Sequence, residues 1–285
     1  LPVERHVGRT GRCRTDGAGE TRGAEAAPQP CVEVVLGEQA VRAAVRELDG
    51  EVPILGEALI GRVLKVVEKA FPGARIFVSI EGAAPAAAEP TVARLVEAGT
   101  LEFVGALPNI VDSIRAASAV TGFPMLVTTA DNVLVTVEAL HALAGAGRSG
   151  EADAIVVMAR KEAIQAAHPG GKGRYYEFRG GGYSNCNLFW IDGPQALAAV
   201  EAFRHGGQFL KVKGRILETF GLVNLIRFKL RLFSLQQMFA FASRKLGVKI
   251  RPLVLKDGRL AIDVDDEKSR QMTEDLLRAD AAKLA

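Results

Sequence analysis

Several features are scarce in this chain of 285 residues, and each scarcity excludes some classes of protein. The three cysteines, Cys13, Cys31 and Cys186, lack the spacing of metal ligands. Their odd number, without the apolar core of a secretory signal, argues against a disulfide framework and favours a reducing, cytoplasmic setting. The longest apolar segments are interrupted by Lys, Arg or Glu, so none reaches the roughly 18 residues of a membrane span.

Net charge is also small. The chain carries 36 Lys and Arg against 33 Asp and Glu, a formal charge of +3. Such a balance provides no strong field for a polyanion, and we expect no nucleic acid as partner.

Apolar residues, by contrast, are plentiful, although they are unevenly placed. Hydrophobic residues make up 48% of the chain, enough for a large core. Residues 1–31 are rich in Gly, Arg, Ala and Pro and have few large apolar side chains. We interpret them as a disordered tail or as sequence foreign to the domain, because little burial would offset the entropy of ordering them. Residues 32–285 are expected to form one domain.

The first part of this domain alternates between strand and helix patterns. Short apolar runs indicate buried strands at 32–36, 75–80, 101–104, 125–127 and 153–159. Apolar residues at helical spacing indicate helices at 57–70, 91–98, 109–117 and 136–144, with Asn109 and Thr136 as N-caps. The alternation predicts an α/β fold with three α/β/α layers and a mixed, mostly parallel sheet.

The second half is less regular. Strands are expected at 175–178, 186–191, 250–255 and 260–264, and helices at 194–203 and 266–278. Between them, residues 208–246 have a helical pattern and are interpreted as a helical insertion. Its stretch 209–241 mixes apolar with basic residues, so it is a candidate for peripheral contact with an anionic membrane surface. A helical cap over a binding pocket and a dimer contact are equally compatible with this pattern.

Asp131 is the most conspicuous polar residue, because it follows the buried strand at 125–127. Ligands of open α/β sheets bind beyond the carboxyl ends of the strands. A second acidic cluster, residues 263–267, follows the expected strand at 260–264. Strand alternation would place Asp263 and Asp265 on one side, where either faces Asp131. Carboxylates together with phosphate oxygens suit Mg²⁺, although a turn aspartate and acidic residues opening a helix are the plainer alternatives.

Five short segments occur in an order that is similar to a known family. They are VVLG at 34–37, VPILGEALIGRVL at 52–64, LVTTADNVLVT at 126–136, GGYSNCNLF at 181–189 and AIDVDDEKS at 261–269. Together they resemble the MobA-like nucleotidyltransferases of the nucleotide-diphospho-sugar transferase superfamily, which have a Rossmann-like GT-A fold. The resemblance implies a Mg²⁺-dependent enzyme that transfers a nucleotidyl group from an NTP to a phosphorylated small-molecule acceptor and releases pyrophosphate.

The resemblance also implies site residues. Asp131 and Asp263 would be the catalytic, metal-binding pair, with Asp265 as a further ligand. The acceptor-binding loop would be formed by Gly182, Tyr183, Ser184, Asn185 and Asn187. The nucleotide-binding candidates are Leu36, Gly37, Asn109, Ser113 and Thr129.

The sequence departs from the family at the triphosphate. The family carries a glycine-rich loop followed by a basic residue, whereas residues 36–39 read Leu-Gly-Glu-Gln, and residues 49–51 read Asp-Gly-Glu where a lysine is expected. A catalytically degenerate nucleotide-binding protein is therefore one alternative. A glycosyltransferase of the same fold, acting on a ready-made nucleotide sugar, is another.

Overall fold

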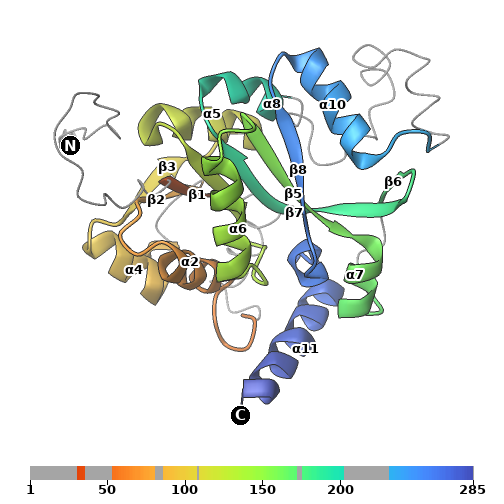
Figure 1. Cartoon of the computed structure of the whole chain (residues 1–285). Helices are drawn as coiled ribbons and strands as arrows, with labels where there is room; N and C mark the ends of the chain where they lie inside the picture. Colours follow the sequence, from red (N-terminus) through yellow and green to blue (C-terminus); the bar gives the residue numbers. More distant parts are fainter. Residues whose placement is uncertain are drawn as a thin grey trace, which may run out of the picture.

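The computed structural model describes residues 31–35, 53–80, 86–107, 109–171, 175–201 and 231–284. An eight-stranded sheet lies at its centre (Figure 1). The strands are β1 (Cys31–Val35), β2 (Ile76–Ile80), β3 (Leu101–Gly105), β4 (Met125–Thr129), β5 (Ala154–Arg160), β6 (Tyr176–Phe178), β7 (Gly181–Ile191) and β8 (Ile250–Leu255). Their order is β3-β2-β1-β4-β7-β5-β8, and β6 pairs with β7 alone.

The sheet is mixed and mostly parallel, as predicted. The pairs β1–β2, β1–β4, β2–β3 and β5–β8 are parallel. Strand β7 is inserted between β4 and β5 and runs antiparallel to both. Strands β4 and β5 therefore point the same way although they are not neighbours, and the start of β7 lies at the edge where they end.

Helices cover both faces. They are α2 (Leu59–Ala70), α4 (Pro90–Glu97), α5 (Ile110–Thr121), α6 (Val137–Arg148), α7 (Lys161–Ala167), α8 (Leu197–Glu201), α10 (Leu235–Leu246) and α11 (Glu267–Leu284), with 3-10 turns η1 (Pro194–Ala196) and η2 (Gly258–Ala261). One apolar core joins the sheet to α2, α4 and α6, and another joins it to α5, α8 and α10 (Figure 1). Consecutive β4 residues divide between these cores, since Leu126 enters the first while Met125 and Val127 enter the second. The three predicted layers are confirmed.

Local signals account for most helix boundaries. The side chains of Asn109 and Thr136 accept hydrogen bonds from the backbone amides of Asp112 and Ala139, so both predicted caps are confirmed. Ser234 and Gln237 form a reciprocal capping box at the start of α10. That start agrees with the predicted break near Ser234. The rest of the predicted helical insertion, residues 208–230, lies outside the described residues.

Two expectations are wrong. The predicted strand at 260–264 is the turn η2 followed by irregular chain. Asp257 caps this turn by accepting from the Arg259 amide, which starts a 3-10 turn in place of a strand. The predicted loop at 181–187 is the first half of β7, because the chain reverses one step earlier, at Arg179 and Gly180.

Among the described residues, no helix combines the length and the apolar character needed to cross a bilayer.

Helix α6 lies on the sheet at a single close contact. Trp190 of β7 is 1% exposed. A Cβ built on Gly147 of α6 would lie 2.2 Å from Cε2 of this indole. Only glycine therefore allows α6 to approach the strand so closely. Gly145, two residues earlier, lies on the opposite face of the same helix. It is exposed, and its Cβ would meet nothing within 4 Å.

These two glycines give a matched test of the packing. We expect Gly147→Ala to lower the free energy of unfolding by about 1–3 kcal/mol through overpacking against Trp190. Gly145→Ala should raise it by about 0.5–1 kcal/mol, because alanine favours an exposed helix interior. Both values are measured by chemical denaturation. Equal effects of the two substitutions would contradict the packing described here.

Candidate functional site

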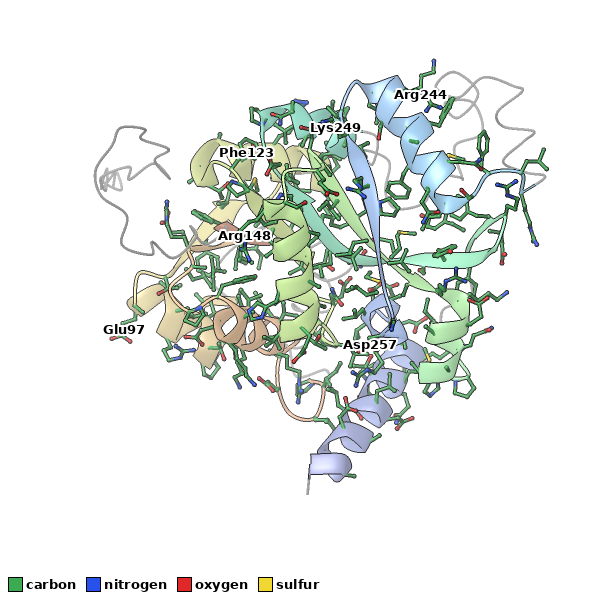
Figure 2. The ribbon with its side chains drawn as sticks, in the orientation of Figure 1. Glu97, Phe123, Arg148, Arg244, Lys249 and Asp257 are labelled. Atoms are coloured by element: carbon green, nitrogen blue, oxygen red, sulfur yellow. The ribbon has the colours of Figure 1, made fainter. Side chains whose placement is uncertain are left out.

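The parallel strands end at a common edge of the sheet. Phe123 and Lys249, which precede β4 and β8, lie at one end of the sheet, whereas Asp257, which follows β8, lies at the other (Figure 2). The antiparallel β7 begins at this second end, where Tyr183 is paired with Arg160, the last residue of β5. The carboxyl ends of β4, β5 and β8 and the start of β7 thus meet where ligands of such sheets bind.

Asp131 lies in the turn that follows β4. The Thr129 hydroxyl donates a short hydrogen bond to Oδ1 of Asp131, which orients the carboxylate. The backbone carbonyl of Asp131 accepts a hydrogen bond of 3.1 Å from the amide of Val264. This bond joins residues 133 positions apart in sequence and brings the chain of Asp131 beside the chain of Asp263.

Asp263 and Asp265 have different environments. Asp263 is 7% exposed, whereas Asp265 is exposed to solvent. Their expected placement on one side required a strand, and this segment is not one. The irregular chain between η2 and α11 instead buries Ile262 and Val264 together with Asp263. The structural basis for grouping Asp265 with the pair is therefore lost.

Asn132 is a structural residue of this site that the sequence interpretation missed. Its side chain is 0% exposed, and Nδ2 donates to the Thr128 hydroxyl at 3.2 Å and to the Cys186 carbonyl at 2.9 Å. One amide thus links the turn that carries Asp131 to β7. The only sequence signal is a polar residue directly after Asp131, and that position says nothing of burial.

The Cys186 carbonyl belongs to a β-bulge. Register against β5 shifts between Val156, opposite Phe189, and Met158, opposite Asn185. Three residues of β7 therefore face one residue of β5, and Asn187 has a positive φ of 47°. The two asparagines at the bulge are hydrogen-bonded to each other, since the backbone amide of Asn187 donates to Oδ1 of Asn185 at 3.0 Å. Bulges of this kind redirect side chains beside functional sites.

The proposed acceptor residues divide into two groups. Tyr183 and Ser184 are buried, and the Tyr183 ring contacts Phe178 at a centroid distance of 5.9 Å. Gly182 is also buried. Asn185 and Asn187 are half-buried, so their amides are the more accessible polar groups of this strand. The acceptor assignment of all five remains a prediction.

Two cations at the end of β5 were not singled out from the sequence. The guanidinium of Arg160 lies 5.3 Å from the Tyr183 ring centroid, and the ammonium of Lys161 lies 5.2 Å from that of Tyr175. Lys161 also forms an ion pair with Glu177 at 3.5 Å. The sequence signal was a basic pair directly after an apolar strand. The basic pair places positive charge at the edge of the sheet that carries Asp131.

The predicted nucleotide-binding residues lie in several places. Leu36 and Gly37 are outside the described residues. Asn109 caps α5, and buried Ser113 accepts from the Leu107 amide at 2.9 Å, so both side chains have structural roles. Thr129 is buried and bonded to Asp131. A nucleotide contact by these residues remains a prediction.

Helix α11 begins directly after the acidic segment. Oδ1 of Asp266 accepts from the Ser269 amide at 2.8 Å, while the Ser269 hydroxyl accepts from the amides of Asp265 and Asp266, each at 2.9 Å. The bond from the Ser269 amide, followed by one that the Ser269 hydroxyl donates to Oδ1 at 3.0 Å, holds the pKa of the Asp266 carboxyl below its ordinary value. Asp266 thus has a capping role, and it fixes the chain just after Asp263.

Carboxylates near Asp131 do not form a complete metal cage. Throughout the ranges that the structure describes, no group of three or more His, Cys, Asp or Glu side chains is arranged to hold a metal ion. Asp131 and Asp263 remain as a candidate pair.

Comparison with known proteins places the fold. No family model matches the chain, and no curated protein matches it. Among solved structures, a hypothetical transferase from Thermus thermophilus is similar with a TM-score of 0.65 and 22% identity, covering 85% of this chain and 100% of that one. The 4-diphosphocytidyl-2C-methyl-D-erythritol synthase from Anaerococcus prevotii is similar with a TM-score of 0.54 and 9% identity, covering 87% and 95%. The predicted Rossmann-like α/β fold is confirmed.

The role of Asn132 is testable by two substitutions. We expect Asn132→Ala to lower the free energy of unfolding by about 1–3 kcal/mol, since it removes the donor to a buried carbonyl. Asn132→Asp should be at least as destabilising at pH 7, because an ionised carboxylate cannot donate, and should recover partly as acid protonates it. Denaturation midpoints at several pH values measure both. Wild-type midpoints in both variants would rule out the linking role.

The cap of α11 has a pH signature. We expect Asp266→Ala to cost about 1 kcal/mol at pH 7, whereas Asp266→Asn, which preserves an N-cap acceptor, should cost less. Because the folded pKa of Asp266 is lowered, its stabilisation is complete above the unfolded pKa near 4 and is lost as pH falls through the folded value. The wild-type advantage over Asp266→Ala should therefore shrink in acid denaturation series. An advantage independent of pH would contradict this assignment.

Proposed function

We propose that this chain is a divalent-metal-dependent nucleotidyltransferase, which transfers a nucleotidyl group from an NTP to a small phosphorylated acceptor and releases pyrophosphate. The observation that carries the proposal is the hydrogen bond from the Val264 amide to the Asp131 carbonyl, which joins the two acidic segments at the carboxyl edge of the sheet. Support also comes from the fold, which the chain shares with the 4-diphosphocytidyl-2C-methyl-D-erythritol synthase.

The residues present fit a hard divalent cation, with Mg²⁺ as the proposed ion. Oriented Asp131 and buried Asp263 offer carboxylate oxygens, and Mg²⁺ commonly takes one or two carboxylates from a protein and its other ligands from water and phosphate. When bound, the ion would neutralise phosphate charge that increases during transfer.

Protein side chains would then act mainly by position. Thr129 holds the Asp131 carboxylate through its hydroxyl, and Asn132 holds the turn against β7. The positive charge of Arg160 and Lys161 would attract the phosphate group of the acceptor. The side-chain amides of Asn185 and Asn187 would form hydrogen bonds with the hydroxyl groups of the acceptor. No protein nucleophile is required for such a transfer, because alignment and electrostatic stabilisation supply most of the catalysis.

The assignment of the pair is tested by binding. The full chain should bind an NTP in the presence of Mg²⁺ by calorimetry, and Asp131→Asn or Asp263→Asn should weaken that binding at least roughly tenfold, about 1.4 kcal/mol. Removing the metal from the wild-type protein with EDTA should have the same effect. Glu151→Gln is the control, because Glu151 is exposed just before β5, at the opposite end of the sheet.

The outcomes separate the alternatives. Absence of metal-dependent NTP binding by the wild-type chain would contradict the proposal. Release of a nucleoside diphosphate from a nucleotide sugar would assign a glycosyltransferase instead. Tight NTP binding without turnover would assign a degenerate nucleotide-binding protein, for which the acidic Leu-Gly-Glu-Gln segment at 36–39 is the sequence argument.

A further inference from the structure

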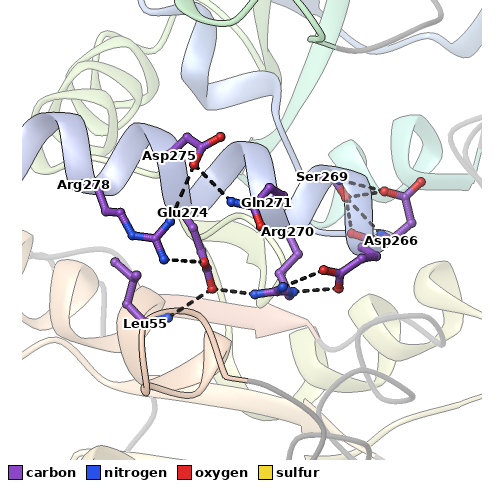
Figure 3. Close-up of polar contacts among 9 residues, drawn as sticks. Leu55, Asp266, Ser269, Arg270, Gln271, Glu274, Asp275 and Arg278 are labelled. Carbon is purple, nitrogen blue, oxygen red and sulfur yellow. Dashed lines mark hydrogen bonds and ion pairs between the residues drawn. The ribbon is translucent and has the colours of Figure 1, made fainter.

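Glu274 of α11 is a buried carboxylate outside the proposed metal pair. Its side chain is 8% exposed and lies between two arginines of its own helix. Arg270 Nη1 contacts Oε1 at 2.5 Å, and Arg278 Nη2 contacts Oε2 at 2.8 Å. Oε1 also accepts a long hydrogen bond of 3.5 Å from the amide of Leu55, which is 219 residues away in sequence (Figure 3). Glu274 therefore connects α11 to the segment before α2.

Leu55 lies in a strained turn. Leu55 and Gly56 have positive φ values of 51° and 79°, as in a type I′ turn, and the Glu57 amide donates to the Ile54 carbonyl at 3.1 Å. A leucine rarely adopts this conformation, so its surroundings must hold it there. From α2, Arg62 Nε donates to the Ile54 carbonyl at 3.3 Å. Glu274 holds the same turn from the side of α11.

The position of this turn in the chain links it to the proposed site. It ends the connection that leads from β1 to α2, and β1 ends at the same sheet edge as β4. Helix α11 begins four residues after Asp263. Glu274 is thus a contact between the helix that follows the proposed metal ligand and the end of the connection that follows β1.

The chemistry of Glu274 favours a geometric role. A buried ion pair seldom stabilises a fold more than apolar side chains of the same volume would, because desolvation offsets the attraction. Its directional bonds instead specify one arrangement of the groups that it joins. Arg270 is further held by Glu267 in the first turn of α11, so the arrangement extends back toward Asp263.

We propose that Glu274 is a positioning residue that sets the turn Ile54–Glu57 relative to the Asp131–Asp263 pair. This inference rests on the proposed function, because it concerns the geometry of the metal pair that the proposed function assigns. Glu274 acts through the contact between the turn and α11, the helix that begins four residues after Asp263. Its loss should weaken nucleotide binding without removing a metal ligand.

The experiment compares three full-length variants with the wild type. Glu274→Gln removes the charge, and Glu274→Asp preserves it for the arginines but withdraws the carboxylate from the Leu55 amide. Asp275→Asn is the matched control, because Asp275 also contacts Arg278, at 3.6 Å, and has no bond to the turn. For each we measure the Kd of an NTP with Mg²⁺ by calorimetry, the melting temperature, and hydrogen exchange at residues 53–58.

Both Glu274 variants should raise the Kd about three- to tenfold and speed exchange at Leu55 and Gly56, whereas Asp275→Asn should change neither. If Glu274→Gln does not fold, Glu274→Asp carries the test, because it keeps a negative charge between the two arginines. A folded Glu274→Asp with wild-type Kd and wild-type exchange overturns the proposal.

If the wild-type chain binds no NTP, the proposed function fails and the nucleotide role of Glu274 fails with it. Faster hydrogen exchange in the Glu274 variants, but not in Asp275→Asn, would then still show that Glu274 holds the turn.

Discussion

The backbone hydrogen bond from Val264 to Asp131 is the interaction on which the candidate site depends. It joins the turn after β4 to the chain after η2, and neither segment belongs to regular structure. Without it, Asp131 and Asp263 would share an edge of the sheet but would have no fixed relation. Asn132 completes the arrangement, because its side chain connects the same turn to the bulge of β7. A main-chain bond and a buried side-chain amide thus hold the acidic segments in place.

The antiparallel insertion of β7 brings a further strand to the edge that carries Asp131. Because β7 begins where β4 and β5 end, its bulge lies beside the turn after β4. Arg160 and Lys161 add positive charge at the end of β5. An edge that carries acids on one strand end and bases on another can hold a metal and an anion together, which a uniformly charged edge cannot. This separation of charge is one argument for the phosphorylated acceptor of the proposed function.

Sequence patterns predicted the layers, and they failed where side chains act through distant partners. The apolar stripe of α2 and the caps Asn109 and Thr136 are local signals, so these three helices were predicted, although α5 and α6 each extend four residues farther than expected. The strand expected at 260–264 was wrong, because Asp257 starts a 3-10 turn and burial there is continuous. Asn132 was missed for a related reason: its partner, the Cys186 carbonyl, lies 54 residues away. Asp131 was found because a strand end is visible in sequence.

Asn132 and Glu274 are buried polar side chains that hold distant segments together, and their burial has a physical meaning. Asn132 and Glu274 each place a polar side chain where an apolar one would incur no desolvation penalty. Each also joins segments that lie at least 54 residues apart in sequence. Apolar contacts are tolerant of small displacements, whereas a hydrogen bond loses most of its strength when its geometry is wrong. A fold that has to hold acidic turns in one relative position therefore gains definition from these bonds, even where they add little stability.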